Sequence, residues 1–356
     1  MTGGRPPAPL HERLFEIDLL RFIAALSVVF YHWAFRGHAA DGLTRLSYPE
    51  ISAVAQYGYL GVELFFVISG FVILMSARSG SLRDFAVSRF VRLYPAFWVS
   101  CTITFAGLTL LNSGHPDLRP GFWQYLMNLT MMSGFFDVAS VDGAYWSLFV
   151  EMRFYLMVAI VLALGWMPHA ERLLWAWFAA VLLLIALRSG RLAVLFNVPH
   201  AALFIAGALL YLVHEGGWTA SRALLLLCSW VLAMVQQLQG LAVHAEHYRT
   251  EYSSWVVGGV ISSIFVVMGC VATGNLRFLR RRSWLPLGAM TYPLYLLHQY
   301  LGYAGFDRLL PFADRRLIFW MSLAAVLVLA FAVQHWIETP LARSLKRALR
   351  KKPALP

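Results

Sequence analysis

The stretch EIDLLRFIAALSVVFYHW, residues 16–33, combines an apolar run with side chains that can bind anions or transfer protons, namely Asp18, Arg21 and His32. A charged group near the centre of a bilayer costs roughly 2.5 kcal/mol or more, so such residues usually have a function. On a straight helix Arg21 and His32 share one face and are about 16 Å apart along the axis. A guanidinium binds anions, and an imidazole accepts a proton near neutral pH. This helix therefore predicts an anion contact at one depth and acid–base chemistry at another.

Polar groups also interrupt other apolar stretches. Glu63 lies in GVELFFVISGF, Glu151 in WSLFVEMRFYL and His298 in YPLYLLHQ. With the N-terminus on the cytoplasmic side, the chain direction places these groups and His32 at similar depths in the outer half of the membrane. We therefore expect the two acids and two histidines to converge. The accompanying polar or aromatic candidates in these motifs are Ser69, Trp146, Ser147 and Tyr155.

A pair of arginines, Arg89 and Arg92, lies three residues apart in SRFVRLYPAFW. That spacing puts both on one face at the predicted start of the third span, where guanidiniums can hold a phosphate. Arginines at a cytoplasmic helix end also satisfy the positive-inside rule without any ligand. Asp18 is expected to cap the first helix or to pair with Arg21.

Composition defines the elements that must position these residues. Of 356 residues, 60% are hydrophobic and 13% charged, which excludes an ordinary soluble domain and predicts an all-α polytopic membrane bundle. Apolar windows of about 20 residues are long enough to span a bilayer. The ten predicted spans are 17–35, 57–77, 92–111, 144–165, 171–187, 198–213, 222–239, 253–273, 286–304 and 316–337. The segment 120–137 is left outside them.

The distribution of Arg and Lys predicts the orientation. The larger share falls in loops on the side of the N-terminus, so both termini are expected in the cytoplasm. We divide the chain into a cytoplasmic segment 1–14, a transmembrane domain 15–342 and a basic cytoplasmic tail 343–356. The formal charge of +11 needs no nucleic-acid partner, because anionic membrane lipids attract basic loops. A bacterial-type cytoplasmic membrane is the expected location.

No metal site or permanently bound cofactor is predicted. The three cysteines are far apart in apolar stretches, which favours packing roles. HAEH, residues 244–247, lacks the spacing of a zinc-binding helix and is expected on a loop surface.

Taken in order, the motifs resemble those of the membrane acyltransferase-3 family. They are Arg21-x10-His32 after Asp18, GVELFFVISGF (61–71), SRFVRLYPAFW (88–98), WSLFVEMRFYL (146–156), YPLYLLHQ (292–299) and HWIETPLARSLKR (335–347). The resemblance covers residues 14–347, with Glu63 standing where aspartate is common. Family members O-acylate, most often O-acetylate, envelope glycans and some small molecules.

The resemblance implies acyl-CoA, most simply acetyl-CoA, as donor substrate and a carbohydrate as acceptor, with partners from polysaccharide biosynthesis or export. By position, it assigns essential roles to Arg21, His32 and Glu151, and a cytoplasmic arginine pair to Arg89 and Arg92. Chemically, His32 would be the general base, with Glu151 fixing its tautomer. Trp146, Ser147 and Tyr155 are candidates for stabilising an oxyanion.

Two alternatives remain open at this stage. Acyl transfer can proceed by direct attack on acyl-CoA or through an acylated protein residue, and both routes use the same residue types. A transporter or flippase of a lipid-linked glycan could instead use the intramembrane charges as a proton or substrate path. Transporters often show internal repeats and interrupted helices in matching halves, and the sequence has no clear repeat of that kind.

Overall fold

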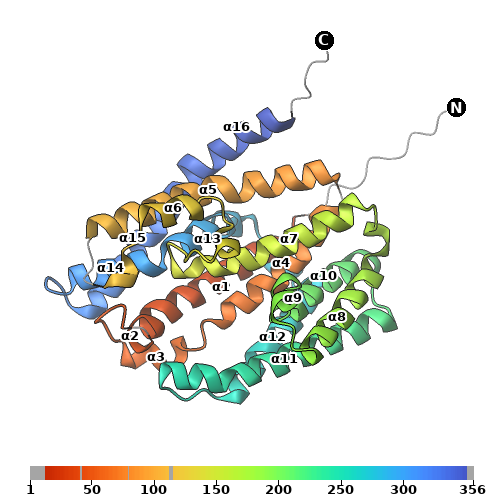
Figure 1. Ribbon diagram of the computed structural model, residues 1–356, viewed down its shortest axis with the longest axis horizontal. Helices are drawn as coiled ribbons and strands as arrows, with labels where there is room; N and C mark the ends of the chain where they lie inside the picture. The colour runs from red at the N-terminus through yellow and green to blue at the C-terminus, as the bar shows by residue number, and fades with distance from the viewer. Residues whose placement is uncertain (1–12, 41, 79, 112–114, 351–356) are drawn as a thin grey trace, which may run out of the picture.

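In a computed structural model, residues 13–40, 42–78, 80–111 and 115–350 are described, and within them the chain forms helices and turns without a β-strand. Figure 1 shows the longer helices running side by side along the bundle. The helices are α1 (Phe15–Tyr31), α2 (Gly37–Ala39), α3 (Pro49–Ala55), α4 (Leu60–Arg78), α5 (Leu82–Leu111), α6 (Phe122–Asn128), α7 (Trp146–Ala163), α8 (Ala170–Ala186), α9 (Gly190–Leu195), α10 (Ala201–Gly216), α11 (Ala220–Tyr248), α12 (Ser254–Ala272), α13 (Leu285–Leu297), α14 (Gln299–Leu309), α15 (Arg315–Ala332) and α16 (Thr339–Arg350). Two π-helical segments, His32–Arg36 and Val333–Glu338, extend α1 and α15.

Among the described residues, eight helical segments are long and apolar enough to cross a membrane. The other two predicted spans have different forms. The span 198–213 is α10, which has only 16 residues. The span 286–304 is interrupted at His298, where α13 ends and α14 begins. The predicted all-α membrane bundle is confirmed, although this span consists of two short helices.

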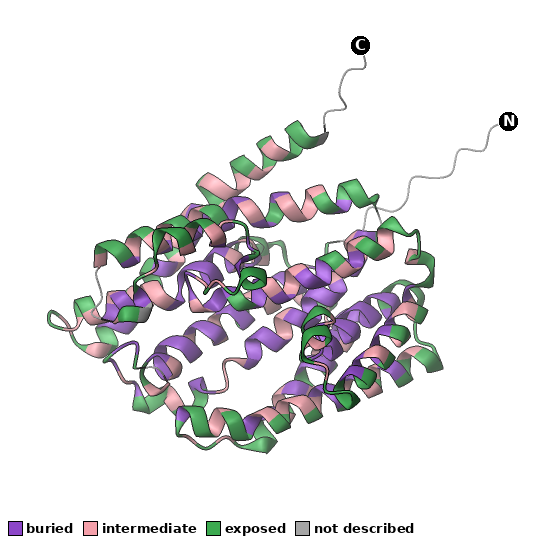
Figure 2. Ribbon diagram, viewed as in Figure 1, coloured by how far each residue is buried: buried purple, intermediate pink, exposed green. Residues whose placement is uncertain are grey.

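The outward faces of the bundle are apolar. Large side chains on outer helices are exposed, including Leu183 on α8 (58%) and Val328 on α15 (69%), while Figure 2 shows buried residues along the interior. Exposed leucines and valines of this number would be costly in water but are the normal surface of a helix in lipid. The chain is therefore a multi-pass membrane protein.

Helix α10 lies at the centre of one half of the bundle and packs against α4. Every residue from Ala201 to Val213 is buried. Two glycines allow the close approach: a Cβ atom at Gly70 would collide with the Phe204 carbonyl, and one at Gly207 with the Val67 carbonyl. The two backbones thus touch directly, which is the usual purpose of small residues between membrane helices.

Several helix bounds differ from the predictions. Helix α5 starts at Leu82, ten residues before the predicted span, because the Ser81 hydroxyl caps it by accepting a hydrogen bond from the Asp84 amide (3.1 Å). Helix α11 continues to Tyr248, so HAEH lies in its last turns and the loop prediction was wrong. The segment 120–137, left outside the spans, forms the short helix α6 and a 3-10 turn.

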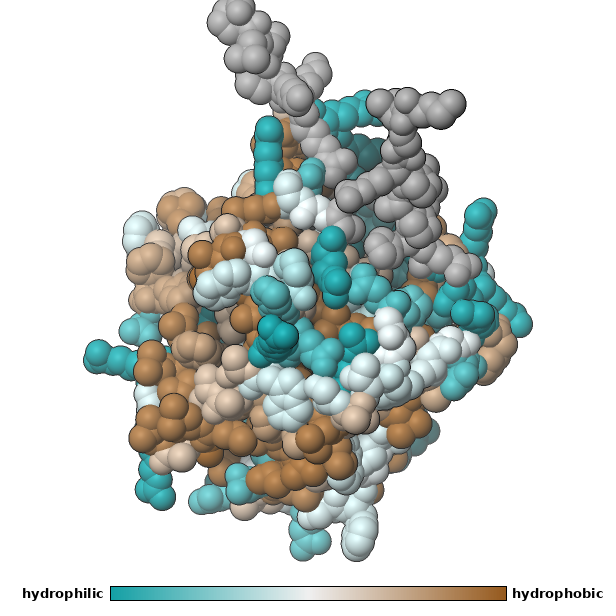
Figure 3. Space-filling model, turned by 90° about the vertical axis from the view of Figure 1, so that its right-hand side faces the viewer, coloured by the Kyte–Doolittle hydropathy of each residue, from teal (hydrophilic) through white to brown (hydrophobic). Residues whose placement is uncertain are grey.

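Helix α1 begins, and helix α16 ends, at the same end of the bundle (Figure 1). Figure 3 views that end, where hydrophilic side chains gather in the middle of the face. Ion pairs tie its helices together: Arg78–Glu215, Arg222–Glu171 and Arg280–Glu16, each at 2.9 Å. Part of the predicted terminal segments, 1–12 and 351–356, lies outside the described residues, and the cytoplasmic assignment stays a prediction.

Substituting Gly207 by alanine is expected to destabilise the bundle, because the added methyl meets the Val67 carbonyl of α4. Overpacking of this kind costs about 1–3 kcal/mol. The measurement is the thermal unfolding midpoint of the purified protein in detergent. Gly259→Ala is the matched control, since a Cβ there meets open space, and its midpoint should stay the same or rise. Equal midpoints for the two variants would contradict this packing.

Candidate active site

His32 lies where helix α1 changes its geometry. The α-helix ends at Tyr31, and residues His32–Arg36 continue as a π-helix. Single π-helical turns occur often at functional sites, because they shift side chains relative to the regular helical positions. The His32 side chain is only 5% exposed, so its ring nitrogens need partners inside the protein or its ligands.

The partner of His32 is His298. The Nδ1 atom of His32 lies 2.8 Å from Nε2 of His298, and Nδ1 of His298 lies 2.9 Å from the carbonyl oxygen of Tyr295. A carbonyl only accepts, so Nδ1 of His298 carries a proton. Burial disfavours a charged imidazolium, and a neutral His298 therefore has a bare Nε2 that accepts from Nδ1–H of His32. The remaining nitrogen of His32, Nε2, is left with a free lone pair.

The helix break at His298 is held by two other residues. The indole of Trp33 donates to the His298 carbonyl (2.8 Å). The buried carboxylate of Asp142 accepts from the Ala144 amide and, through its other oxygen, from the Tyr300 amide, both at 2.9 Å. Because these bonds fix both sides of the break, they fix the position of His298 as well.

A cavity of about 510 Å³ adjoins His32, and we call it the histidine pocket. Its wall is built from α1 and the π-helical segment after it, from α4, α11 and α13, and from the residues that begin α7 and precede α10. Among its lining residues are His32, Glu63, Trp146, His200 and Gln237. The amide of Gln237 donates to one oxygen of Glu63 (2.9 Å). Several polar side chains therefore line this cavity inside a membrane bundle.

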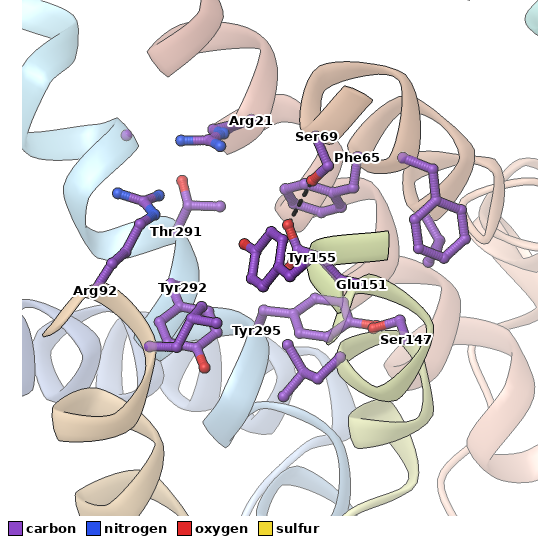
Figure 4. A pocket seen from close by; sticks show the side chains of 15 residues that line it. Arg21, Phe65, Ser69, Arg92, Ser147, Glu151, Tyr155, Thr291, Tyr292 and Tyr295 are labelled. Carbon is purple, nitrogen blue, oxygen red and sulfur yellow. Dashed lines mark hydrogen bonds between the residues drawn. The ribbon is translucent and has the colours of Figure 1, made fainter. Parts of the chain in front are cut away.

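A second, smaller pocket of about 80 Å³ is lined by Arg21, Ser69, Arg92, Glu151 and Tyr155, and we call it the arginine pocket. Figure 4 shows Arg21 and Arg92 extending into it from one side and Ser69 and Glu151 facing it from another. The Ser69 hydroxyl donates to the Glu151 carboxylate (2.7 Å). Two guanidiniums and one carboxylate leave the pocket with an excess of positive charge, which suits an anionic group.

The two pockets share part of their walls. Val62 and Tyr295 line both of them. The Tyr295 hydroxyl is within 2.8 Å of the Ser147 hydroxyl and donates to the Ala144 carbonyl (3.1 Å). Tyr295 thus separates the arginine pocket from the histidine pocket, and its backbone carbonyl binds His298.

Two sequence-based expectations are corrected by these positions. Glu151 lies in the arginine pocket and accepts from Ser69, so it does not fix the His32 tautomer; His298 occupies that place. Asp18 does not cap α1, whose N-cap position is Leu14; its carboxylate pairs with Arg13 (3.2 Å) and attracts Arg21 electrostatically without a hydrogen bond.

Arg89 and Arg92 also separate. Both lie inside α5, which starts before the predicted span, but only Arg92 lines the arginine pocket. Arg89 lies over the rings of Phe85 and Tyr155, at 5.8 and 5.7 Å from their centres, in a lateral cavity. The pair therefore does not hold one phosphate between its guanidiniums in this structure.

Sequence reasoning missed several residues of the site, including Asp142, His200 and Gln237. Asp142 precedes a glycine and a helix start, which indicates a capping turn but not a buried carboxylate with two amides. Gln237 lies in a predicted span, and its polarity in an apolar run was the available signal.

The fold and pockets define a polytopic membrane protein with a polar site inside its helix bundle. A family model described as an acyltransferase domain matches residues 14–335. The chain therefore belongs to this acyltransferase family, and the resemblance seen in the motifs is confirmed. No solved structure matches the chain at a significant level.

Curated relatives agree with the family. Nodulation protein 10 of Rhizobium leguminosarum is 33% identical over 168 residues, covering 41% of this chain and 44% of the relative. YrhL of Bacillus subtilis, a candidate peptidoglycan O-acetyltransferase by its name, is 27% identical over 93% of this chain and 55% of the relative. Peptidoglycan O-acetyltransferase OatA of Listeria monocytogenes is 27% identical over 45% of this chain and 26% of the relative. The chain thus spans about half or less of the length of these relatives.

The histidine network leads to a spectroscopic prediction. In protein labelled with 15N-histidine, His32 and His298 should both be neutral with the proton on Nδ1. The Tyr295 carbonyl requires a proton on Nδ1 of His298, so Nε2 of His298 accepts and Nδ1 of His32 donates. The measurement is the 15N shift of each ring nitrogen, assigned with His32→Ala and His298→Ala. A proton found on Nε2 of His32 would contradict the network.

Proposed function

We propose that this protein is an O-acyltransferase that moves an acyl group, acetyl in the first instance, from cytoplasmic acyl-CoA to a hydroxyl of an envelope or exported polysaccharide. One observation carries the proposal: a buried imidazole whose Nδ1 is bound by a second histidine, so that its Nε2 is free to take a proton beside a polar cavity. Membership of the acyltransferase family supports it.

In this proposal Nε2 of His32 is the general base. It accepts the proton of the acceptor hydroxyl as the oxygen attacks the thioester carbonyl carbon. The new C–O bond forms, the C–S bond breaks, and the proton passes from the imidazolium to the departing sulfur. A positioned base of this kind contributes typically about 10²–10⁴-fold to the rate.

His298 supports that base. Its bare Nε2 accepts from Nδ1–H of His32, which orients the ring and stabilises the imidazolium formed during the reaction. This is the role that a carboxylate has in hydrolase triads. A neutral histidine supports the imidazolium less strongly than a carboxylate does, but it adds no second buried charge when the base is at rest.

The donor is proposed to enter from the end of the bundle where α1 begins. Arg21 and Arg92 would bind phosphate groups of the coenzyme at the arginine pocket, with Glu151 balancing their charge when the pocket is empty. The thioester would reach His32 past Tyr295, which lines both pockets. Ser147, hydrogen-bonded to Tyr295, is our candidate for donating to the oxyanion.

The proposal also includes the sides of the membrane and the partners. The donor end is cytoplasmic, both termini lie on that side, and the membrane is a bacterial-type inner membrane. The histidine pocket serves a carbohydrate acceptor, which proteins of polysaccharide biosynthesis or export would supply.

His32→Ala is expected to lower acyl transfer by about 10²–10⁴-fold, the usual contribution of a general base. The assay follows thiol release from acetyl-CoA in nanodiscs that also contain membrane glycans, with the acylated product identified by mass spectrometry. His169→Ala, an exposed histidine in a short 3-10 turn, is the matched control and should retain wild-type activity.

Full activity in His32→Ala would show that His32 is not the general base. Movement of a glycan across the membrane by wild-type protein, without any thiol release, would support the transporter alternative instead.

Arg92→Ala and Arg21→Ala are expected to raise the KM for acyl-CoA about tenfold or more, since each loses a charged hydrogen bond to phosphate. The KM for the acceptor should stay unchanged, because these residues line the arginine pocket and not the histidine pocket. Arg347→Ala on exposed α16 is the control. An effect of Arg92→Ala confined to the acceptor KM would reverse the assignment of the pockets.

A further inference from the structure

Of the predicted arginine pair, Arg89 lines neither the arginine pocket nor the histidine pocket. Its half-buried side chain lines a third cavity, of about 340 Å³, between α5 and α7, which we call the lateral cavity. The Arg89 guanidinium lies over the rings of Phe85 and Tyr155, and within the described part of the chain it makes no hydrogen bond or ion pair. Ring faces attract a cation but offer no oxygen to its N–H donors. Arg89 therefore has donors available for an anionic ligand.

The rest of the lateral cavity is mainly apolar, with side chains such as Met152 and Leu156 in its wall. Among the described residues that line it there is no Asp or Glu. A second arginine in the wall, Arg153, directs its guanidinium elsewhere, over the Phe149 ring (4.8 Å from its centre) and to the Val194 carbonyl, neither of which lines the cavity. A ligand here therefore meets one unpaired cation and an apolar surface.

The lateral cavity opens at the outside of the bundle. Leu156 on α7 and Phe135 in the 3-10 turn after α6 both line it, and they are 50% and 52% exposed. Apolar side chains exposed on the outside of a membrane bundle contact lipid. A ligand can thus reach the cavity from the bilayer without passing through the arginine pocket or the histidine pocket.

Hydrogen bonds fix the side of the lateral cavity that follows α6. The Tyr94 hydroxyl donates to the Thr130 carbonyl (3.0 Å), and the Trp98 indole donates to the Leu129 carbonyl (2.9 Å). Both bonds satisfy backbone acceptors just after α6 has ended, and they hold this segment against α5. Residues 132–135, which come next, complete the wall. The cavity is therefore a built feature of the packing between α5, α7 and this segment.

The position of Arg89 along α5 suits a lipid headgroup. Helix α5 has 30 residues and is a candidate span, so it is about 45 Å long, close to the thickness of a bilayer with its headgroups. Arg89 comes seven residues after Leu82, the first residue of α5, and so lies about 10 Å from that end. This depth is near the boundary between headgroups and hydrocarbon, where lipid phosphates can meet an arginine side chain.

We propose that the lateral cavity binds one anionic phospholipid, with the phosphate on Arg89 and part of an acyl chain along the apolar wall. A free phosphate would leave the apolar wall unused. A zwitterionic headgroup carries its own cation beside the phosphate, which weakens the attraction to Arg89. Leu93 and Tyr155 line both this cavity and the arginine pocket, so the lipid supports a wall of that pocket from a separate site.

The test is native mass spectrometry of the full-length protein in detergent, titrated with dioleoyl phosphatidylglycerol or dioleoyl phosphatidylcholine. The first phosphatidylglycerol should bind to wild-type protein about tenfold more tightly than the first phosphatidylcholine. Equal affinities for the two lipids would overturn the proposal, because they would show that the bound headgroup is not selected by charge.

Variants locate the lipid. Arg89→Gln should weaken binding of the first phosphatidylglycerol about tenfold or more, since it loses a charged hydrogen bond to phosphate. Ala86→Phe, at an exposed position that lines the cavity, fills part of the space while keeping Arg89, and should weaken binding as well. Arg347→Ala, on exposed α16, is the matched control for general attraction to the membrane and should bind as wild type does. Wild-type affinity in both Arg89→Gln and Ala86→Phe would overturn the site.

Coenzyme A is the other phosphate-bearing ligand in this account, and the same instrument separates it from the lipid. Added to wild-type protein that holds one phosphatidylglycerol, coenzyme A should bind without releasing the lipid. Release of one lipid for each coenzyme A bound would assign the lateral cavity to the donor and overturn the proposal. Lipid binding that depends on Arg89 stands whether or not the protein releases thiol from acetyl-CoA, so the two proposals can fail separately.

Discussion

The site depends on one hydrogen bond, from Nδ1 of His32 to Nε2 of His298. It joins the π-helical end of α1 to the break between α13 and α14, and both rings are buried. A buried polar group without a partner is costly, so each histidine requires the other to stay in place. The Tyr295 carbonyl, the Trp33 indole and the Asp142 carboxylate in turn hold the break. Loss of any of these contacts would alter the position of the free nitrogen of His32.

Around this bond the bundle forms two pockets of different character. The arginine pocket has guanidiniums suited to an anion, and the histidine pocket has acceptors and hydroxyls suited to a polar neutral group. Tyr295 takes part in both, through its ring in the shared wall and through its carbonyl on His298. In our proposal, this division explains why the two polar residues of the first span, Arg21 and His32, lie so far apart. Arg21 and His32 serve different substrates of one reaction in our proposal, on opposite sides of the same wall.

The sequence predicts the class of fold well and the site only in part. Apolar length alone predicts most membrane helices, because lipid imposes it on each helix separately. The intramembrane polar residues can also be recognised in the sequence, because each one costs free energy in an apolar span. The sequence does not show which residue pairs with His32, because that contact joins distant segments: His32 meets His298 rather than Glu151. The break at His298 has no loop composition to reveal it, and nothing in the spacing of Arg89 and Arg92 shows that their side chains line different cavities.

The most direct test of the account is a cryo-EM structure with a non-reactive thioether analogue of acetyl-CoA. The account predicts the coenzyme phosphates beside Arg21 and Arg92, and the acyl carbon on the side of Tyr295 that faces Nε2 of His32. An acyl group that ends in the arginine pocket, beside Ser69 and Glu151 and away from His32, would contradict it.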